Sequence, residues 1–132
     1  MLNVLRTKEI KNQIAEAPEK VQEIVDNVKD YGICITDENG YFKTINPRYT
    51  EIYGYTKDEL VGKHFSLVLP DDQKKKLSSM HDKFIENQYE ILRNWQVEKK
   101  DGTPIKIQAD AGYSEDIFDK TPHKITFVYY ED

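Results

Sequence analysis

Hydrophobic residues near the N-terminus recur at the spacing of an α-helix. Residues 2–14 predict one amphipathic helix, and Pro18, which suits a first helical turn, begins a second. Their apolar faces consist of Leu2, Leu5, Ile10 and Ile14 in the first helix and of Val21, Ile24, Val25 and Val28 in the second. Because residues 1–30 contain no partner for either face, we expect each helix to pack on the rest of the chain or on a second copy.

From Tyr31 onward the pattern changes to short runs of high β propensity separated by turns. Five such runs are predicted to be strands: 32–36, 41–45, 90–98, 105–111 and 125–130. Residues 37–40 and 99–102 have the composition of tight turns, so the first and second runs, and likewise the third and fourth, predict hairpins. The last run is apolar on both faces, which is typical of a central strand covered on both sides.

Between the two hairpins lies a series of short helices. Asn46 followed by Pro47 predicts the start of one helix, and Gly54 predicts its end. Thr56 and Glu59 have the spacing of a capping box. A longer helix is expected to begin at Asp71 and Asp72 and to carry an apolar stripe of Leu77, Met80, Phe84 and Ile85. Two hairpins separated by helices predict an α+β fold, an antiparallel sheet with helices packed on one face.

Composition narrows the classes of function. The chain has 132 residues, which fits one domain, and its formal net charge of −5 argues against nucleic-acid binding. Its one cysteine, Cys34, excludes an internal disulfide and a cysteine-based zinc site. No apolar run is as long as a membrane span, and the charged N-terminus does not resemble a signal peptide, so we expect a soluble cytoplasmic protein. The sequence shows no catalytic triad and no phosphate-binding loop, so we do not expect an enzyme.

The order and spacing of several short motifs resemble the PAS family of sensory domains. The motifs are Gly32-Ile33-Cys34-Ile35-Thr36-Asp37 with Gly40, Asn46-Pro47, the run from Gly54 to Lys63, Leu69-Pro70-Asp71-Asp72 and Lys99-Lys100-Asp101-Gly102. The resemblance covers residues 31–132 as a PAS core. It implies a five-stranded antiparallel sheet in the order 2-1-5-4-3, with helices closing a pocket over one face. Residues 1–30 then correspond to the N-terminal helices that, in this family, commonly cover the outer sheet face and help to form a homodimer.

The resemblance also implies that this chain is part of a longer signalling protein, and it implies two possible functions. PAS domains usually continue past a terminal aspartate, here Asp132, so the chain resembles the input module of a bacterial histidine kinase or diguanylate cyclase with a covalently linked output domain. One function is a sensor that binds a small molecule in the pocket, and the other is a ligand-free module that dimerises or relays a signal. Candidate dimer-interface residues are Leu2, Leu5, Ile10, Ile14, Ile33, Ile35, Ile125, Phe127 and Tyr129.

With PAS geometry, the alternation of side chains along the strands assigns the residues that face the pocket. The candidates, including residues from the helices, are Cys34, Thr36, His64, Phe65, Met80, Phe84, Trp95, Val97, Ile107, Ala109, Ala111, Thr126, Val128 and Tyr130. Several are small, whereas a filled core would favour larger groups, so one interpretation is a ligand cavity with polar contacts from Thr36, Thr126 and the Tyr130 hydroxyl. The other interpretation is that the space is filled by Trp95, Phe65, Phe84 and Met80.

The sequence does not name the ligand, and the best-known cofactors of the family match it poorly. Haem-binding members supply an axial histidine from the long helix, but His81 lies late in that helix, which argues against haem. Flavin photosensors require a cysteine where this chain has Phe65, and the photoactive yellow protein chromophore requires one near Pro70. His64 is expected either at the pocket mouth, facing an anion, or as a partly exposed loop residue. His123 is expected in a polar loop, and three scattered histidines predict no metal site.

Overall fold

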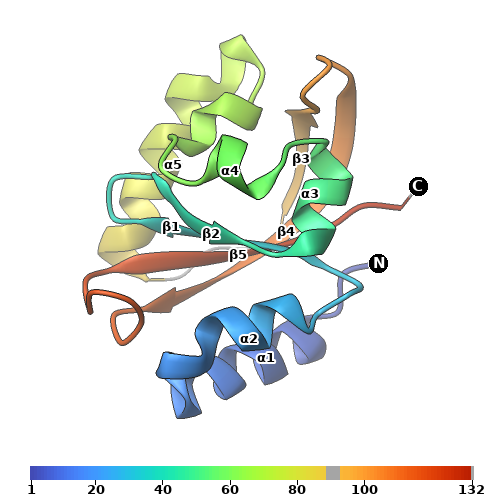
Figure 1. The fold of residues 1–132 in the computed structure, drawn as a ribbon. Coiled ribbons are helices and arrows are strands. Elements are labelled where there is room, and N and C mark those ends of the chain that lie inside the picture. Colours follow the sequence, from blue (N-terminus) through green and yellow to red (C-terminus); the bar gives the residue numbers. More distant parts are fainter. Residues whose placement is uncertain (89–92, 132) are drawn as a thin grey trace.

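A five-stranded antiparallel sheet separates two layers of helices. The computed structural model describes residues 1–88 and 93–131. The strands are β1 (Gly32–Asp37), β2 (Phe42–Ile45), β3 (Arg93–Glu98), β4 (Pro104–Ser114) and β5 (His123–Tyr129), in the order β2-β1-β5-β4-β3 (Figure 1). β5 pairs with both β1 and β4. The predicted sheet order is confirmed, and the run that is apolar on both faces is the central strand.

Helices cover both faces of the sheet (Figure 1). The inner face carries α3 (Pro47–Tyr53), α4 (Lys57–Leu60), the 3-10 turns η2 (Phe65–Val68) and η3 (Asp71–Gln73), and α5 (Lys74–Asn87). The outer face carries α1 (Val4–Glu16), the 3-10 turn η1 (Pro18–Lys20) and α2 (Val21–Asp26). The helix predicted to follow Pro70 therefore begins with one 3-10 turn and continues as α5.

Side-chain caps explain the boundaries of the short helices. The Oδ1 atom of Asn46 accepts the Tyr49 N–H at 3.1 Å, and Gly54 ends α3 with a φ of 79°. Thr56 and Glu59 form a reciprocal capping box at the start of α4, with N···O distances of 2.9 and 3.3 Å. These caps satisfy backbone N–H groups that a helix start leaves without partners. Local sequence is therefore sufficient to place both helices.

The outer face of the sheet and the N-terminal helices form one hydrophobic core. Its buried members are Leu2, Ile10, Ile14, Val21, Val25, Val28, Tyr31, Ile33, Ile35, Ile117, Ile125 and Phe127. Polar contacts also hold α1 on β4. Asp110 accepts hydrogen bonds from the Thr7 hydroxyl at 2.6 Å and the Lys11 ammonium at 3.4 Å, and the Leu2 N–H donates to the Gln108 side chain at 2.8 Å.

This outer core changes the interpretation of the candidate dimer interface. Of the predicted residues, those buried within a single chain are Leu2, Ile10, Ile14, Ile33, Ile35, Ile125 and Phe127. Tyr129 is half-buried against the same core, whereas Leu5 is 70% exposed. The partner of the outer sheet face is thus the chain's own N-terminal helices. The hydrophobic pattern alone could not decide between the chain's own N-terminal helices and those of a second copy, because both carry the same apolar face. A homodimer through other surfaces stays a prediction.

The region between β4 and β5 differs from the prediction at two positions. His123 is not in a loop, since it is the first residue of β5 and is fully buried. Its pairing with Asp37 and Ser114 extends the ladder beyond the apolar run. Ile117, in the polar connection, is fully buried in the outer core. Parts of other predictions lie outside the described residues: Glu90, Ile91 and Asp132.

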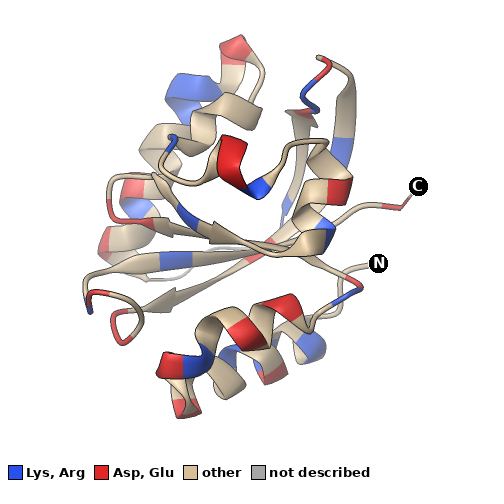
Figure 2. Cartoon of the chain, viewed as in Figure 1, with Lys and Arg blue, Asp and Glu red and all other residues tan. Residues whose placement is uncertain are grey.

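Charged residues of both signs are spread over the helices and turns instead of forming one basic face (Figure 2). This distribution agrees with 24 acidic and 19 basic residues in the chain. Within residues 1–88 and 93–131, no helix combines the length and the apolar character that crossing a bilayer demands.

Candidate functional site

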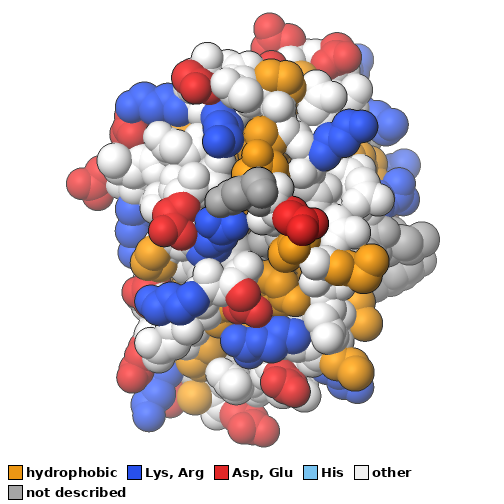
Figure 3. Space-filling model, turned by 90° about the vertical axis from the view of Figure 1, so that its right-hand side faces the viewer, with side chains coloured by type: hydrophobic (Ala, Val, Ile, Leu, Met, Phe, Trp, Pro, Cys, Tyr) orange, Lys and Arg blue, Asp and Glu red, His pale blue; other side chains and the backbone are white. Residues whose placement is uncertain are grey.

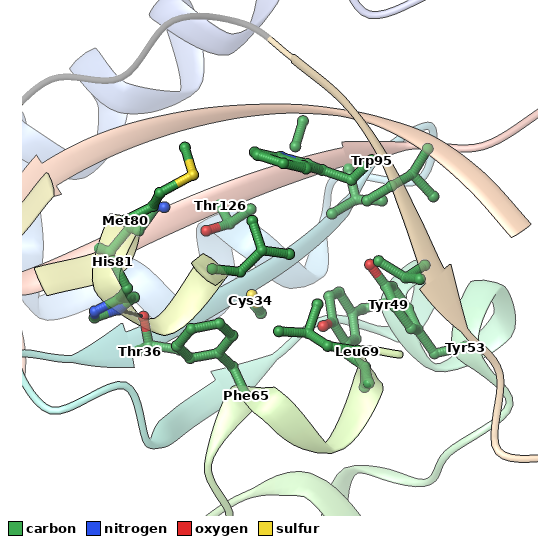
Figure 4. A pocket seen from close by; sticks show the side chains of 17 residues that line it. Cys34, Thr36, Tyr49, Tyr53, Phe65, Leu69, Met80, His81, Trp95 and Thr126 are labelled. Carbon is green, nitrogen blue, oxygen red and sulfur yellow. Dashed lines mark hydrogen bonds between the residues drawn. The ribbon is translucent and has the colours of Figure 1, made fainter. Parts of the chain in front are cut away.

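A cavity of about 90 Å³ lies between the sheet and the inner helices (Figure 4). It is lined by Cys34, Thr36, Tyr49, Tyr53, Phe65, Val68, Leu69, Leu77, Met80, His81, Trp95, Val97, Ile107, Ala109, Lys124, Thr126 and Val128. Protein interiors are normally packed so closely that voids larger than a water molecule are few. The cavity is therefore the first place in the described structure to look for a bound molecule.

Most of the residues predicted to face a pocket line this cavity. They are Cys34, Thr36, Phe65, Met80, Trp95, Val97, Ile107, Ala109, Thr126 and Val128. Strand alternation places the eight strand residues among them correctly, because successive side chains of a strand point to opposite faces of the sheet. Phe65 and Met80 come from η2 and α5. The small side chains Cys34, Thr36 and Ala109 leave space that the large rings of Phe65 and Trp95 do not fill.

Four predicted pocket residues do not line the cavity. His64 instead caps η2, where its Nδ1 accepts a backbone N–H at 3.1 Å. Phe84 is buried near the ring of Tyr113, with 6.5 Å between ring centroids. Ala111 is buried further along β4. Tyr130 is half-buried against the hydrophobic core between the sheet and the inner helices, but it does not line the cavity. The strand pattern gives the face of Ala111 and Tyr130 but not where along that face the cavity ends.

The cavity also contains residues that the pocket prediction omitted. These are Tyr49, Tyr53, Val68, Leu69, Leu77, His81 and Lys124. A signal existed for five of them. Tyr49 and Tyr53 lie one helical turn apart in the helix predicted to follow Asn46, and Lys124 has the same alternation as Thr126 two positions later. Leu77 belongs to the predicted apolar stripe of the long helix, and His81 follows it by one turn. Val68 and Leu69 carry no such signal, because their position depends on the course of an irregular segment.

His81 and Thr36 form a buried polar pair at one end of the cavity (Figure 4). The Nε2 atom of His81 lies 2.8 Å from the Thr36 hydroxyl oxygen, while Nδ1 has no hydrogen-bond partner among the described residues. Burial, together with the nearby charges of Lys124 and His64, lowers the pKa of His81 to about 4, while the Asp37 carboxylate opposes this shift. The imidazole is therefore neutral at pH 7, because its pKa lies well below that pH.

Neutral hydroxyl and thiol groups from α3, β1 and β5 form another polar part of the wall. Burial raises the pKa of the Cys34 thiol to about 11, although interactions with Tyr49 and Thr126 oppose this shift. Burial also raises the pKa values of Tyr49 and Tyr53, whose rings are stacked with 4.2 Å between centroids. At pH 7 all of these groups are protonated and uncharged. They can donate or accept hydrogen bonds, but Cys34 is not a reactive thiolate.

A series of four aromatic rings in contact leads from the surface to His81. The ring of Tyr41, which is 45% exposed, meets His64 edge-on, His64 stacks on Phe65, and Phe65 stacks on His81 with 5.0 Å between centroids. Gly40 makes this packing possible. A Cβ atom at Gly40 would lie 2.7 Å from His64 Nε2 and 2.9 Å from the Phe65 ring, and the φ of 87° is itself unfavourable for other residues. The turn glycine thus positions one wall of the cavity.

The structure has an antiparallel sheet of order 2-1-5-4-3 with a pocket between the sheet and short helices. A comparison of the sequence with known families gives a consistent result. The family model described as the PAS fold matches residues 19–120. The chain belongs to the PAS family. PAS domains are generally sensory, non-catalytic modules, and this assignment makes the chain a PAS domain of the sensory and signalling type.

Similar proteins support the PAS assignment and give its context. The PAS domain of a protein from Desulfitobacterium hafniense superposes with a TM-score of 0.72 at 17% identity, covering 83% of this chain and 99% of that one. A domain of a sensory box sensor histidine kinase/response regulator from Geobacter sulfurreducens gives 0.69 at 16% identity, covering 87% and 96%. At these identities the likeness shows the fold alone.

A sequence relative is "Two-component system protein A" of Emericella nidulans. It is 41% identical over 64 residues, which are 48% of this PAS domain. The same segment spans only 9% of that relative, so the PAS domain is similar to a small part of a much longer protein. The chain is therefore homologous to domains of two-component signalling proteins.

The cavity of this PAS domain does not fit haem or flavin. Pockets for drug-sized ligands occupy roughly 300–1,000 Å³, whereas this cavity measures about 90 Å³. The His81 Nε2 that an iron would need is already bonded to Thr36. Cys34 is the only cysteine of the chain and lies on β1, so the segment around Phe65 offers no thiol. In the described part of the chain, no three His, Cys, Asp or Glu side chains are grouped as metal ligands.

Proposed function

We propose that this PAS domain is a sensor that binds a small molecule in the cavity and relays its presence to a linked output domain. The observation that carries the proposal is the unfilled volume of about 90 Å³ between sheet and helices. Filling a cavity restores contacts that its lining lacks, so a molecule of suitable shape gains binding energy there. The mixed lining, apolar side chains with a few polar groups, is typical of ligand sites.

The proposed relay passes through β5, which faces the cavity on one side and the N-terminal helices on the other. Thr126 and Val128 line the cavity, while Ile125 and Phe127 belong to the outer core. A ligand that fits one packing of these side chains better than another shifts the population toward that packing. Because α1 and α2 rest on the same strand, the shift would change how they are held.

The proposal of an output domain is supported by the relatives. The 64-residue match makes up only 9% of the relative in which it lies, and one structural neighbour is a domain of a sensor histidine kinase/response regulator. We propose a histidine kinase type of output domain, with a diguanylate cyclase as the alternative. The proposed location of such an assembly is the cytoplasm.

Native mass spectrometry of the purified domain tests the sensor proposal. We expect an additional mass of small-molecule size that is lost on denaturation. Ala109→Phe should abolish it, because Ala109 lines the cavity and the larger ring fills the space. Ala111→Phe is the matched control, since Ala111 is buried on the same strand but outside the lining, and both variants should lose about 1–3 kcal/mol of stability from overpacking. Normal signalling by a folded Ala109→Phe variant of the full-length protein would contradict the sensor function.

The second candidate function is a ligand-free dimerisation module. The observation in its favour is the exposed apolar surface of α1, where Val4 is 52% and Leu5 70% exposed. On the face shown in Figure 3, by contrast, hydrophobic side chains are interspersed with charged ones. If α1 forms a homodimer contact, Leu5→Glu should convert a dimer to a monomer in light scattering without changing the fold. An unchanged mass would exclude this surface.

A further inference from the structure

The wall of the cavity is chemically divided into an apolar part and an uncharged polar part. Phe65, Leu69, Met80 and Trp95 surround the space from η2, α5 and β3, and their side chains point toward one another across it (Figure 4). The polar groups come from β1, α3 and β5: Cys34, Thr36, Tyr49, Tyr53 and Thr126. The strands also contribute apolar side chains, namely Val97, Ile107, Ala109 and Val128, so a molecule placed here meets carbon on most sides and hydroxyl or thiol groups at a few points.

Charged side chains are nearly absent from the lining of the cavity. Among the described lining residues, Lys124 is the only lysine, arginine, aspartate or glutamate. Its Nζ lies 4.8 Å from the ring centroid of Phe84, a residue that does not line the cavity, so the ammonium group sits against a ring at the edge of the site. Moving a charged ligand from water into such surroundings is costly unless several hydrogen bonds and a counter-charge replace its hydration.

The volume sets an upper limit on the size of the ligand. An apolar cavity of about 150 Å³ holds benzene, and this cavity measures about 90 Å³. A molecule with about four non-hydrogen atoms is therefore the largest that enters without moving the walls. Larger ligands would have to displace half-buried members of the lining such as Phe65, Met80 or Trp95.

We propose that the sensed ligand is a compact, uncharged molecule with an apolar body and one hydrogen-bonding end, and that the cavity rejects a carboxylate or an ammonium compound of the same size. This inference rests on the proposed sensor function and adds the chemical class of the ligand. The apolar body packs between Phe65, Met80 and Trp95. The hydrogen-bonding end faces the hydroxyl groups of Thr126 and the α3 tyrosines.

The test uses three probes of nearly equal size: acetamide, acetate and ethylammonium. Trp95 is the only tryptophan of the chain and lines the cavity, so its fluorescence reports occupancy directly. At pH 7 we expect acetamide to bind at least tenfold more tightly than acetate or ethylammonium. Ala109→Phe should remove the response to acetamide, which separates binding in the cavity from contact with the exposed edge of the indole.

The possible results lead to different conclusions. Tighter binding of acetate, lost in Lys124→Met, would overturn the uncharged class while leaving a sensor of an anion in place. If native mass spectrometry finds a ligand but none of the probes competes with it, the ligand class is wrong and the sensor function stands. If acetamide gives no response and no ligand is found, both are wrong.

Discussion

Asn46 joins three segments of the chain through a single buried amide. Its Oδ1 accepts the Ile33 and Tyr49 N–H groups at 2.8 and 3.1 Å. Its Nδ2 donates to the carbonyl oxygens of Val25, Val28 and Tyr31 at 3.0–3.1 Å. The side chain thus caps α3, contacts β1 and holds the end of α2, and it is only 1% exposed. Buried groups left without partners cost more than the bond itself contributes.

We expect Asn46→Ala to lower the free energy of unfolding by about 3 kcal/mol, because several buried backbone groups lose their only side-chain partner. Asn46→Asp keeps both accepted bonds but directs a carboxylate at three carbonyl oxygens, so it should also destabilise. Urea unfolding measures both. Asn3→Ala is the control, since Asn3 caps α1 at an exposed position and should cost about 1 kcal/mol. An equal loss for Asn46→Ala and Asn3→Ala would refute the anchoring role.

His81 makes stability depend on pH in a known direction. The pKa in the folded protein is about 4, against an ordinary value of 6.5. As the pH falls, the unfolded chain binds a proton near pH 6.5, but the folded chain does so only near pH 4. Stability is therefore complete at neutral pH and is lost between about pH 6.5 and pH 4. The shift corresponds to about 3 kcal/mol at most.

Urea unfolding of the wild type and His81→Gln between pH 7 and pH 4 tests this expectation. The variant should lose stability less steeply than the wild type over that interval, because glutamine does not titrate. His64→Gln is the matched control and should keep most of the dependence, since burial, the largest cause of the low pKa of His81, remains when the smaller contribution of His64 is removed. Parallel curves for the wild type and His81→Gln would show that another group causes the pH dependence.

At the scale of elements, α1 is held on the sheet by both apolar and polar contacts. Ile10 and Ile14 are buried in the outer core, and Thr7, which is fully buried, donates to Asp110 on β4. The Lys11 ammonium lies 3.4 Å from the same carboxylate and 5.7 Å from the ring centroid of Phe127. Because α1 precedes the PAS core and touches it at these few positions, its attachment can be weakened separately.

Asp110→Ala should weaken the docking of α1 by about 1–3 kcal/mol, because the Thr7 hydroxyl loses a buried acceptor and Lys11 loses its counter-charge. Hydrogen exchange measures the effect. The amide groups of α1 should exchange faster, whereas those of β1 and β5 should change less. Asp101→Ala, in the exposed turn after β3, is the control and should leave α1 unaffected. Uniform acceleration throughout the chain would indicate global destabilisation instead of local release.

At the scale of the whole molecule, the sheet separates two hydrophobic cores, one beneath the inner helices and one beneath the N-terminal helices. The outer face of β1 and β5 carries Ile33, Ile35, Ile125 and Phe127, each at most 2% exposed in the presence of the N-terminal helices. Removal of residues 1–30 would expose this surface to water. Contiguous apolar surfaces of this kind drive association between molecules.

We expect deletion of residues 1–30 to cause self-association, detected by light scattering as a mass above that of the intact chain at the same concentration. Ile125→Arg in the shortened chain should reduce it, because a charge then interrupts the exposed apolar face. A monomeric, folded shortened chain would show that the outer face tolerates water and that the helices serve another purpose.

The local sequence pattern determined most of the helices and strands and the face that each predicted strand residue takes. Cys34, Thr36, Ala109 and Thr126 were placed on the cavity side because side-chain alternation is a local property of a strand. Caps such as Asn46 and Gly54 were equally local. The sheet order came from the resemblance to PAS domains, which the chain carries as a series of short motifs.

Only the tertiary structure decided which surfaces meet and how much space remains between them. The hydrophobic pattern of α1 did not say whether its partner was this chain or another, because burial energy is non-directional. The extent of the cavity depends on where η2 and α5 place Leu69, Met80 and His81, and small shifts of those segments change a volume of 90 Å³. His123 and Lys124 became buried because the β5 ladder continues past its apolar run. Such outcomes depend on the simultaneous packing of distant segments, which no local pattern contains.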